Sequence, residues 1–149
     1  MSTSREFEYN DVPVGYQVCF NAECPMRETC LRWKSGQKVP AEKKWGAAIY
    51  PTALEADGTC LYFHKMEPKR MAWGFDHLFY NVLARDNKSL RTDLRKYLGG
   101  KTPYYRYNRG DRLLTPEQQE WIIRRFESAG YTKDLEFDGY VTTYDFHQR

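Results

Sequence analysis

Apolar positions recur at helical spacing mainly in the second half of the chain. The first such run begins at Pro68 and ends near Asp86-Asn87, and its apolar positions are Met71, Phe75, Leu78, Phe79 and Val82. Steps of three and four residues place these side chains on one face of a helix. The spacing therefore predicts a helix over this segment.

A shorter run follows the first. Its apolar positions are Leu90, Leu94, Tyr97 and Leu98, and the pair Gly99-Gly100 comes directly after them. Glycine ends helices because it adopts the left-handed conformation at little cost. The pattern predicts a second helix that ends at this pair.

A third helix is predicted from its first residues. Thr115 provides an N-cap hydroxyl, Pro116 suits the first helical position, and Gln118 completes a capping box. The inward-facing positions are Ile122, Phe126 and Ala129, and Gly130 stops the helix.

Between the second and third helices the residue types favour a small hairpin. Tyr104 to Tyr107 are mostly aromatic and favour a strand, Asn108 to Asp111 resemble a turn, and Arg112 to Leu114 form the returning strand. The tail from Leu135 to Phe146 alternates loosely and fits either an edge strand or a short helix.

The first half of the chain is irregular. Prolines at positions 13, 25, 40 and 51 divide residues 7–65 into short pieces, although Thr29 to Lys34 allow a turn or two of helix. We therefore expect a mainly helical α+β fold, with an irregular N-terminal four-cysteine lobe packed on three helices and a short hairpin. It forms one domain, residues 1–149, with a cysteine-rich metal-binding lobe at 19–65 and a helical, basic-aromatic part at 66–149.

Composition agrees with one globular domain. The chain has 149 residues, of which 41% are hydrophobic, 29% charged and, unusually, 16% aromatic. Its first ten residues are polar and lack the apolar core of a secretory signal, and no apolar run approaches the roughly 20 residues that cross a bilayer. We expect a cytoplasmic protein with no membrane contact.

The four cysteines are the strongest chemical signal. Cys19, Cys24, Cys30 and Cys60 follow the pattern C-x4-C-x5-C-x29-C. In a reducing compartment such spacing indicates metal chemistry before disulfides. Four thiolates complete a closed tetrahedral zinc site, which serves structure rather than catalysis. Arg27, Arg32 and Lys34 lie nearby in sequence, and their charge favours deprotonated sulfur.

Several alternatives to zinc remain open. An iron–sulfur cluster needs the same ligands, although plant-type ferredoxins space the second and third cysteines by two residues rather than five. The four cysteines also fit a buried apolar role, or redox and disulfide chemistry. His64, four residues after Cys60, could replace one cysteine in a three-cysteine, one-histidine site.

Positive charge gathers in the second half of the chain. Between Lys88 and Lys133 there are eleven Lys and Arg residues against five Asp and Glu, whereas the whole chain carries only +3. Cations interleaved with aromatic rings suit phosphates and stacked bases. The candidate nucleic-acid-binding residues are Arg91, Arg95, Lys101, Tyr105, Arg106, Tyr107, Arg109 and Arg112.

The same residues also fit a solvated helix face with tyrosines in the core, or a surface that binds a protein. An acidic tail at Glu136, Asp138 and Asp145 is placed to neutralise them internally. No phosphate loop, nucleophile elbow or paired-carboxylate motif is present, so an enzyme is disfavoured and no small-molecule substrate is evident.

Three longer motifs carry a family resemblance. They are Cys19-x4-Cys24-Pro25-x4-Cys30-Leu31-Arg32, then Cys60-x-Tyr62-Phe63, then the segment from Tyr104 to Pro116 with the pattern Y-Y-R-Y-x-R-G-x-R-L-L-T-P. Over nearly its whole length the chain resembles a family of short bacterial proteins of uncharacterised function. The resemblance implies that the cysteines and the basic-aromatic segment belong together, and it implies no activity.

The sequence therefore predicts a small cytosolic protein with a structural zinc site that acts as a regulatory nucleic-acid-binding module. A protein-interaction adaptor is the alternative, and an iron–sulfur redox module is the third possibility. Nucleic acid and protein partners are left undecided.

Overall fold

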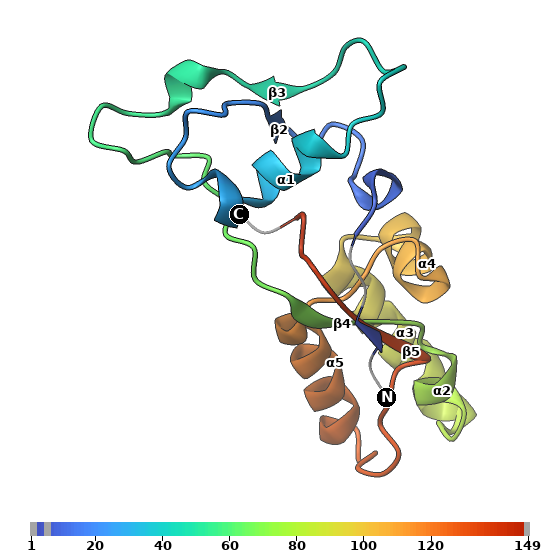
Figure 1. Cartoon of the computed structure of the whole chain (residues 1–149). Helices are drawn as coiled ribbons and strands as arrows, with labels where there is room; N and C mark the ends of the chain where they lie inside the picture. The colour runs from blue at the N-terminus through green and yellow to red at the C-terminus, as the bar shows by residue number, and fades with distance from the viewer. Residues whose placement is uncertain (1–2, 5–6, 148–149) are drawn as a thin grey trace. The chain divides into compact units, whose positions relative to one another are not determined.

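The computed structural model describes residues 3–4 and 7–147 and has a mixed α+β fold (Figure 1). The chain divides into two compact units. We call the unit made of Lys69–Thr143 and Thr3–Ser4 the helical unit, and the unit made of residues 7–68 and 144–147 the cysteine unit. The rest of the polar N-terminus, residues 1–2 and 5–6, lies outside the described residues.

A three-stranded sheet organises the helical unit. Strand β5 (Gly139–Thr143) lies between β1 (Thr3–Ser4), to which it is parallel, and β4 (Lys69–Trp73), to which it is antiparallel. The tail that fitted either a strand or a helix is thus a strand. Strand β5 is central in this sheet because β1 pairs with one of its edges and β4 with the other.

The helices of this unit are α2 (Asp76–Phe79), α3 (Ala84–Leu98), α4 (Lys101–Arg109) and α5 (Pro116–Ser128). Both α4 and α5 contact β4, and α3 contacts both of those helices. Their apolar faces form one core that includes Ala72, Leu90, Leu94, Tyr104, Tyr107, Ile122 and Phe126. None of the helices in the described part of the chain is both long and apolar enough to cross a membrane.

The predicted helix from Pro68 to Asn87 is wrong over its first part, and the remainder is not one helix, because residues 80–83 separate α2 from α3. Residues Lys69–Trp73 form strand β4 instead, and Met71 and Ala72 are buried there. Gly74 then takes a φ of 88°, and both carboxylate oxygens of Asp138 accept backbone N–H groups at the start of α2. Pairing with β5, 70 residues away, outweighs the local helical spacing.

The predicted hairpin is also wrong, because its first strand is helix α4. Tyr104 and Tyr107, three residues apart, are both buried on the inner face of this helix. Gly110, with φ of 84°, ends the helix where a turn was predicted. The strand preference of tyrosine misled the prediction, whereas the three-residue spacing of the buried rings was the better signal.

The other two helices are confirmed. Helix α3 ends at Gly99, which has φ of 98°, although it begins at Ala84, earlier than Leu90. Helix α5 begins with the predicted capping box: the Gln118 N–H donates to Thr115 Oγ1 at 3.2 Å, and the Thr115 N–H donates to Gln118 Oε1 at 2.9 Å.

Replacing the N-cap Thr115 by alanine is expected to lower the free energy of unfolding by about 1 kcal/mol, because the Gln118 N–H loses its acceptor. Urea denaturation followed by circular dichroism measures this loss. Thr92→Ala, at an exposed position within α3, is the control and should change stability by less than about 0.5 kcal/mol. Equal midpoints for the two variants would show that the cap contributes nothing.

The cysteine unit contains short elements joined by loops, as predicted. These are η1 (Tyr9–Asp11), β2 (Val18–Cys19), η2 (Arg27–Thr29), α1 (Leu31–Gln37), β3 (Ala48–Ile49) and η3 (Pro51–Ala53). Strands β2 and β3 pair in parallel, and α1 packs against β2.

Few apolar side chains are buried in the cysteine unit. Among its described residues the buried hydrophobic side chains are Phe7, Val18, Cys30 and Leu31, whereas the helical unit buries fourteen. A segment of this length with so small a core gains little stability from packing. Something besides apolar burial is needed to hold its loops in place.

Candidate metal centre

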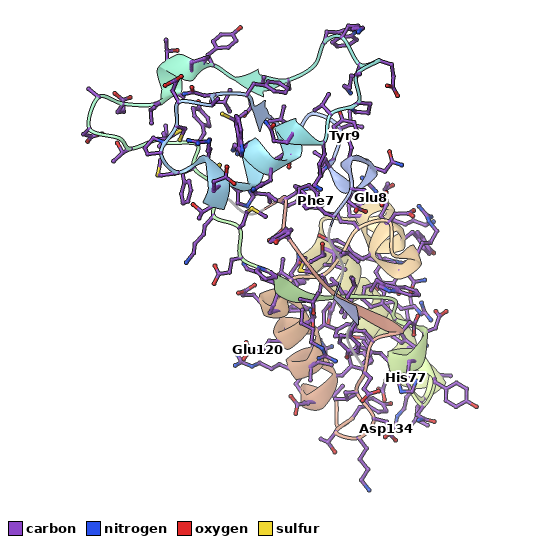
Figure 2. The ribbon with its side chains drawn as sticks, viewed as in Figure 1. Phe7, Glu8, Tyr9, His77, Glu120 and Asp134 are labelled. Atoms are coloured by element: carbon purple, nitrogen blue, oxygen red, sulfur yellow. The ribbon has the colours of Figure 1, made fainter. Side chains whose placement is uncertain are left out.

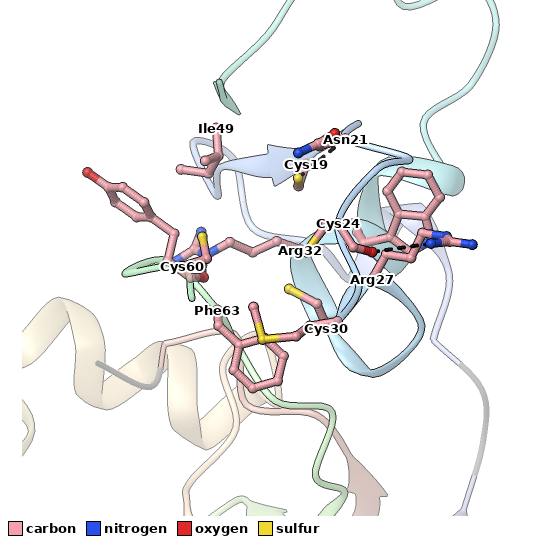
Figure 3. Close-up of a pocket in the computed structure, with 12 residues that line it drawn as sticks. Cys19, Asn21, Cys24, Arg27, Cys30, Arg32, Ile49, Cys60 and Phe63 are labelled. Carbon is pink, nitrogen blue, oxygen red and sulfur yellow. Dashed lines mark hydrogen bonds between the residues drawn. The ribbon is translucent and has the colours of Figure 1, made fainter. Parts of the chain in front are cut away.

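The four cysteines, spread over 42 positions of the chain, line one small pocket of the cysteine unit. Figure 3 shows the sulfur atoms of Cys19, Cys24, Cys30 and Cys60 around the same space. The cavity measures about 20 Å³, which is room for a water molecule or a single metal ion and not for an organic ligand. Its other lining residues are mostly apolar or cationic.

Backbone pairing brings three of these cysteines together. Cys19 lies on β2 and pairs with Ile49 of β3, Cys30 forms an isolated bridge with Lys65, and Cys60 forms another with Leu54. Cys30 also precedes α1, whose first N–H, from Leu31, donates to the carbonyl of His64 at 2.6 Å. Cys19 and Cys30 therefore lie where two distant segments pair, whereas Cys60 lies in a loop closed by a local bridge.

Cys24 lies in the loop between Cys19 and η2. Its N–H donates to the carbonyl of Asn21 at 3.2 Å, and its own carbonyl accepts the N–H of Arg27 at 3.2 Å. The N–H of Asn21 in turn lies 3.5 Å from the Cys19 sulfur. A backbone N–H that faces a sulfur atom stabilises its negatively charged form.

All four thiols are free, and no group of three or more His, Cys, Asp or Glu side chains among the described residues is placed to hold a metal ion. Zn–S bonds of about 2.3 Å in a tetrahedron set the sulfurs about 3.8 Å apart. The thiols of the described residues are not placed in such a tetrahedron.

Two arginines line the pocket beside the thiols. The Arg32 guanidinium donates to the carbonyls of Gln17 and Tyr62, both at 2.8 Å, so it ties together the segments that carry Cys19 and Cys60. Arg27 donates to the carbonyl of Cys24 at 3.2 Å. Two cationic side chains therefore lie at the pocket that the four cysteines share.

Lys34, the third cation near the cysteines in sequence, does not line the pocket. Its ammonium lies 2.7 Å from a carboxylate oxygen of Glu28, and this hydrogen bond holds the pKa of Glu28 below its usual value.

His64 lines a neighbouring pocket rather than the one that the cysteines share. It is buried, and its Nδ1 lies 2.7 Å from the hydroxyl of Tyr16. Burial raises the pKa of this tyrosine well above its ordinary value, although the nearby Arg32 charge opposes the rise. Tyr16 is therefore the neutral partner of His64 at physiological pH, and the substitution of His64 for a cysteine stays a prediction.

The sequence match that decides the family covers residues 1–146. The chain belongs to the family of unknown function DUF6078. Comparison with curated proteins and with solved structures finds no match. Membership in DUF6078 agrees with the resemblance stated above, and it assigns no chemistry to the cysteines.

Some residues of this DUF6078 chain that shape the pocket carried no clear sequence signal. Gly36, inside α1, is buried so closely against β2 that an added Cβ would overlap the carbonyl oxygen of Cys19. Phe63 and Met26 also line the pocket. A glycine within a helical segment was the one available hint, because glycine there is otherwise unfavourable.

Gly36→Ala is expected to destabilise the cysteine unit by about 2 kcal/mol, because the new methyl group must push β2 and Cys19 away from α1. The sign of this change in stability is informative, because replacing glycine by alanine within a helix ordinarily stabilises a protein by about 1 kcal/mol. Urea midpoints measure the change. Gly46→Ala is the matched control, as its Cβ would meet only the end of Lys43 at 3.4 Å. A Gly36 variant as stable as this control would exclude the close approach.

The predicted nucleic-acid residues fall into two groups. Tyr107 is only 2% exposed, and its hydroxyl lies 3.3 Å from Nε2 of Gln118 within the helical unit, so it is not available for stacking. Arg91 donates to the hydroxyl of Tyr104 at 3.1 Å, and Arg95 lies over the ring of Tyr104 at 5.3 Å. These two arginines thus join α3 to α4.

The second group faces solvent on α4. Lys101, Tyr105, Arg106 and Arg109 are all exposed, and Tyr105 retains 37% of its accessible surface. Arg109 pairs with Asp111 at 2.9 Å, while the half-buried Arg112 lies over the ring of Tyr107 at 5.2 Å. The structure therefore leaves one exposed strip of cations with a single aromatic ring beside it.

Proposed function

We propose that this protein is a small interaction module whose cysteine unit is held by one structural zinc ion. Cys19, Cys24, Cys30 and Cys60 supply the four thiolates, and the ion replaces the apolar core that the unit lacks. The observation that carries the proposal is the shared pocket of the four thiols in a unit with so few buried apolar side chains.

A four-thiolate site has no open position, so its role is structural rather than catalytic. Arg27 and Arg32 offset part of the charge of the thiolates. An iron–sulfur cluster uses the same ligands, but the space of about 20 Å³ favours a single ion. Zinc is therefore preferred to the cluster.

The proposed partner is a protein, because large apolar side chains are exposed beside the pocket. Tyr62 and Phe63 line it, and Leu61 and Tyr50 are each next in sequence to a residue that does. All four are exposed, and we call them the aromatic rim. Soluble proteins rarely expose such clusters without a binding role. By fixing Cys60 and, through Cys19, the strand pair of β2 and β3, the ion would also hold this rim in shape.

Metal analysis of protein purified without oxygen tests the site. We expect one zinc per chain, no visible absorption, and loss of the metal in Cys24→Ser because three thiolates leave the tetrahedron open. Met26→Leu, which changes the same pocket without removing a thiol, is the control and should keep the metal. Metal-free protein that is as stable as any metal-loaded sample would contradict the proposal, and a brown protein containing iron and sulfide would replace zinc by a cluster.

Nucleic-acid binding is the second candidate, and the exposed strip of α4 favours it. If Lys101, Arg106 and Arg109 neutralise phosphates and Tyr105 stacks on a base, binding must weaken steeply with salt. The double variant Arg106→Ala/Arg109→Ala should then flatten the salt slope by about one to two units. Arg124→Ala/Lys133→Ala removes two exposed charges elsewhere in the helical unit and is the matched control. If neither single-stranded nor duplex nucleic acid shows salt-sensitive binding, nucleic-acid binding is rejected and a protein is the only proposed partner that remains.

A further inference from the structure

A second hollow of the cysteine unit is much larger than the cysteine pocket. Its volume is about 440 Å³, within the range of roughly 300–1,000 Å³ that is usual for ligand sites. Some residues of segment 9–20 form one wall and some of segment 39–47 the other, and Asp11 and Glu42 of these segments are not among the lining residues. The first wall includes Tyr9 of η1, labelled in Figure 2. We call this hollow the groove.

The lining of the groove is apolar with a cationic edge. Val12, Val18 and Val39 lie within it, and Val14 and Trp45 lie on its exposed rim, where the tryptophan keeps 88% of its accessible surface. Lys43 and Lys44 are its charged residues, and neither aspartate nor glutamate occurs among the described residues that line it. The groove therefore presents positive charge beside apolar surface.

Among residues 3–4 and 7–147, no carboxylate pairs with either ammonium group of the groove. Lys43 Nζ lies 5.3 Å from the ring centre of Tyr9, a cation–π contact, and Lys44 Nζ donates to the carbonyl of Ala41 at 2.8 Å. An ammonium has three N–H donors, so each lysine keeps donors for an anionic ligand. The wall from segment 39–47 thus places two cations beside the apolar lining of the groove.

From this complementarity we infer that the groove binds an acidic peptide segment of a partner protein, with one large apolar side chain against its apolar lining and flanking carboxylates on Lys43 and Lys44. Trp45 and Val14 cover the apolar side chain. A concave groove of this volume suits an inserted side chain better than a flat surface such as a bilayer. The inference rests on the proposed interaction role and names the chemistry of its partner.

Fluorescent peptide mixtures test the groove on the full-length, metal-loaded protein. The acidic probe is a mixture of pentapeptides with Leu, Ile, Phe or Trp at the centre and Asp or Glu at the four other positions, and the neutral probe has Ser or Gln there. We expect saturable binding of the acidic mixture, about tenfold tighter than that of the neutral one, because two charge pairs are added. Fluorescence anisotropy measures both.

Two variants and one control localise the binding. Lys43→Gln/Lys44→Gln should weaken the acidic mixture by about tenfold, and Trp45→Ala should weaken both mixtures. Lys88→Gln/Lys96→Gln removes the same charge from exposed positions of α3 and should leave both affinities unchanged. Equal effects of the two double variants, or equal affinity for acidic and neutral mixtures, overturn the inference.

Anionic phosphatidylserine vesicles test whether the groove binds a lipid surface instead of a peptide. The protein could bind these vesicles, lose that binding in Lys43→Gln/Lys44→Gln, and show no saturable binding of any peptide mixture. This result would assign the groove to a lipid surface and contradict the inference that it binds a peptide. The zinc content of every sample is measured in parallel. Failure of peptide binding at full zinc content refutes the groove alone, whereas peptide binding by a protein that never holds metal refutes the zinc site alone.

Discussion

Removal of the proposed zinc with a chelator is expected to unfold the cysteine unit and to leave the helical unit folded. The ion supplies on the order of 10 kcal/mol in small zinc domains, and the cysteine unit has few buried apolar side chains to offset its loss. The helical unit has its own core of aromatic and aliphatic residues and needs no metal. After metal removal the thermal transition should therefore be that of the helical unit alone.

Amide hydrogen exchange distinguishes the two units residue by residue. The N–H of Leu31, bonded to the carbonyl of His64, should lose protection in the chelated protein, while that of Leu94 in the core of α3 should keep it. Readdition of zinc is the control and should restore the protection of Leu31. Unchanged exchange at Leu31 after complete metal removal would show that the cysteine unit is stable without the ion.

Phe126→Ala is expected to destabilise the helical unit by about 4 kcal/mol. Phe126 is fully buried, and its ring meets that of Phe79 edge-to-face with centres 5.2 Å apart. Truncation removes this contact and leaves a cavity in the core, for which losses of about 3–5 kcal/mol are usual. Urea unfolding followed by the helical circular dichroism signal measures it.

The neighbouring Glu127 provides the control. It is exposed on the same helix, so Glu127→Ala should change stability by less than about 0.5 kcal/mol. A loss below about 1 kcal/mol in Phe126→Ala would contradict the assignment of this ring to the core.

The helices that were predicted correctly are those whose ends are determined by residues close in sequence. Thr115 and Gln118 cap α5 with their own side chains, and Gly99 ends α3 through its backbone conformation. Strand β4 was missed because its pairing depends on β5, far away in sequence. Helix α4 was missed because its two core tyrosines were assessed by their strand preference, and the contacts that bury them come from other elements.

The cysteine pocket was anticipated from residue type and spacing, since Cys19, Cys24 and Cys30 are close in sequence. The role of Arg32 in tying Gln17 to Tyr62 needed the structure, because it depends on how three loops cross. The groove could not be predicted from the sequence either, because its two walls come from separate irregular segments without periodicity.

The pairing of β1 with β5 has a consequence for synthesis. Thr3 lies opposite Val141 in this sheet, so strand β1 is made long before the strand with which it pairs. Long-range pairing of this kind forms late, because the intervening chain must first be closed into a loop. The cysteine unit lies between these strands in sequence and is complete in all but residues 144–147 well before β5 is made. If the cysteine unit binds zinc as proposed, all four of its ligands are made before strand β5 and hence before this sheet can close.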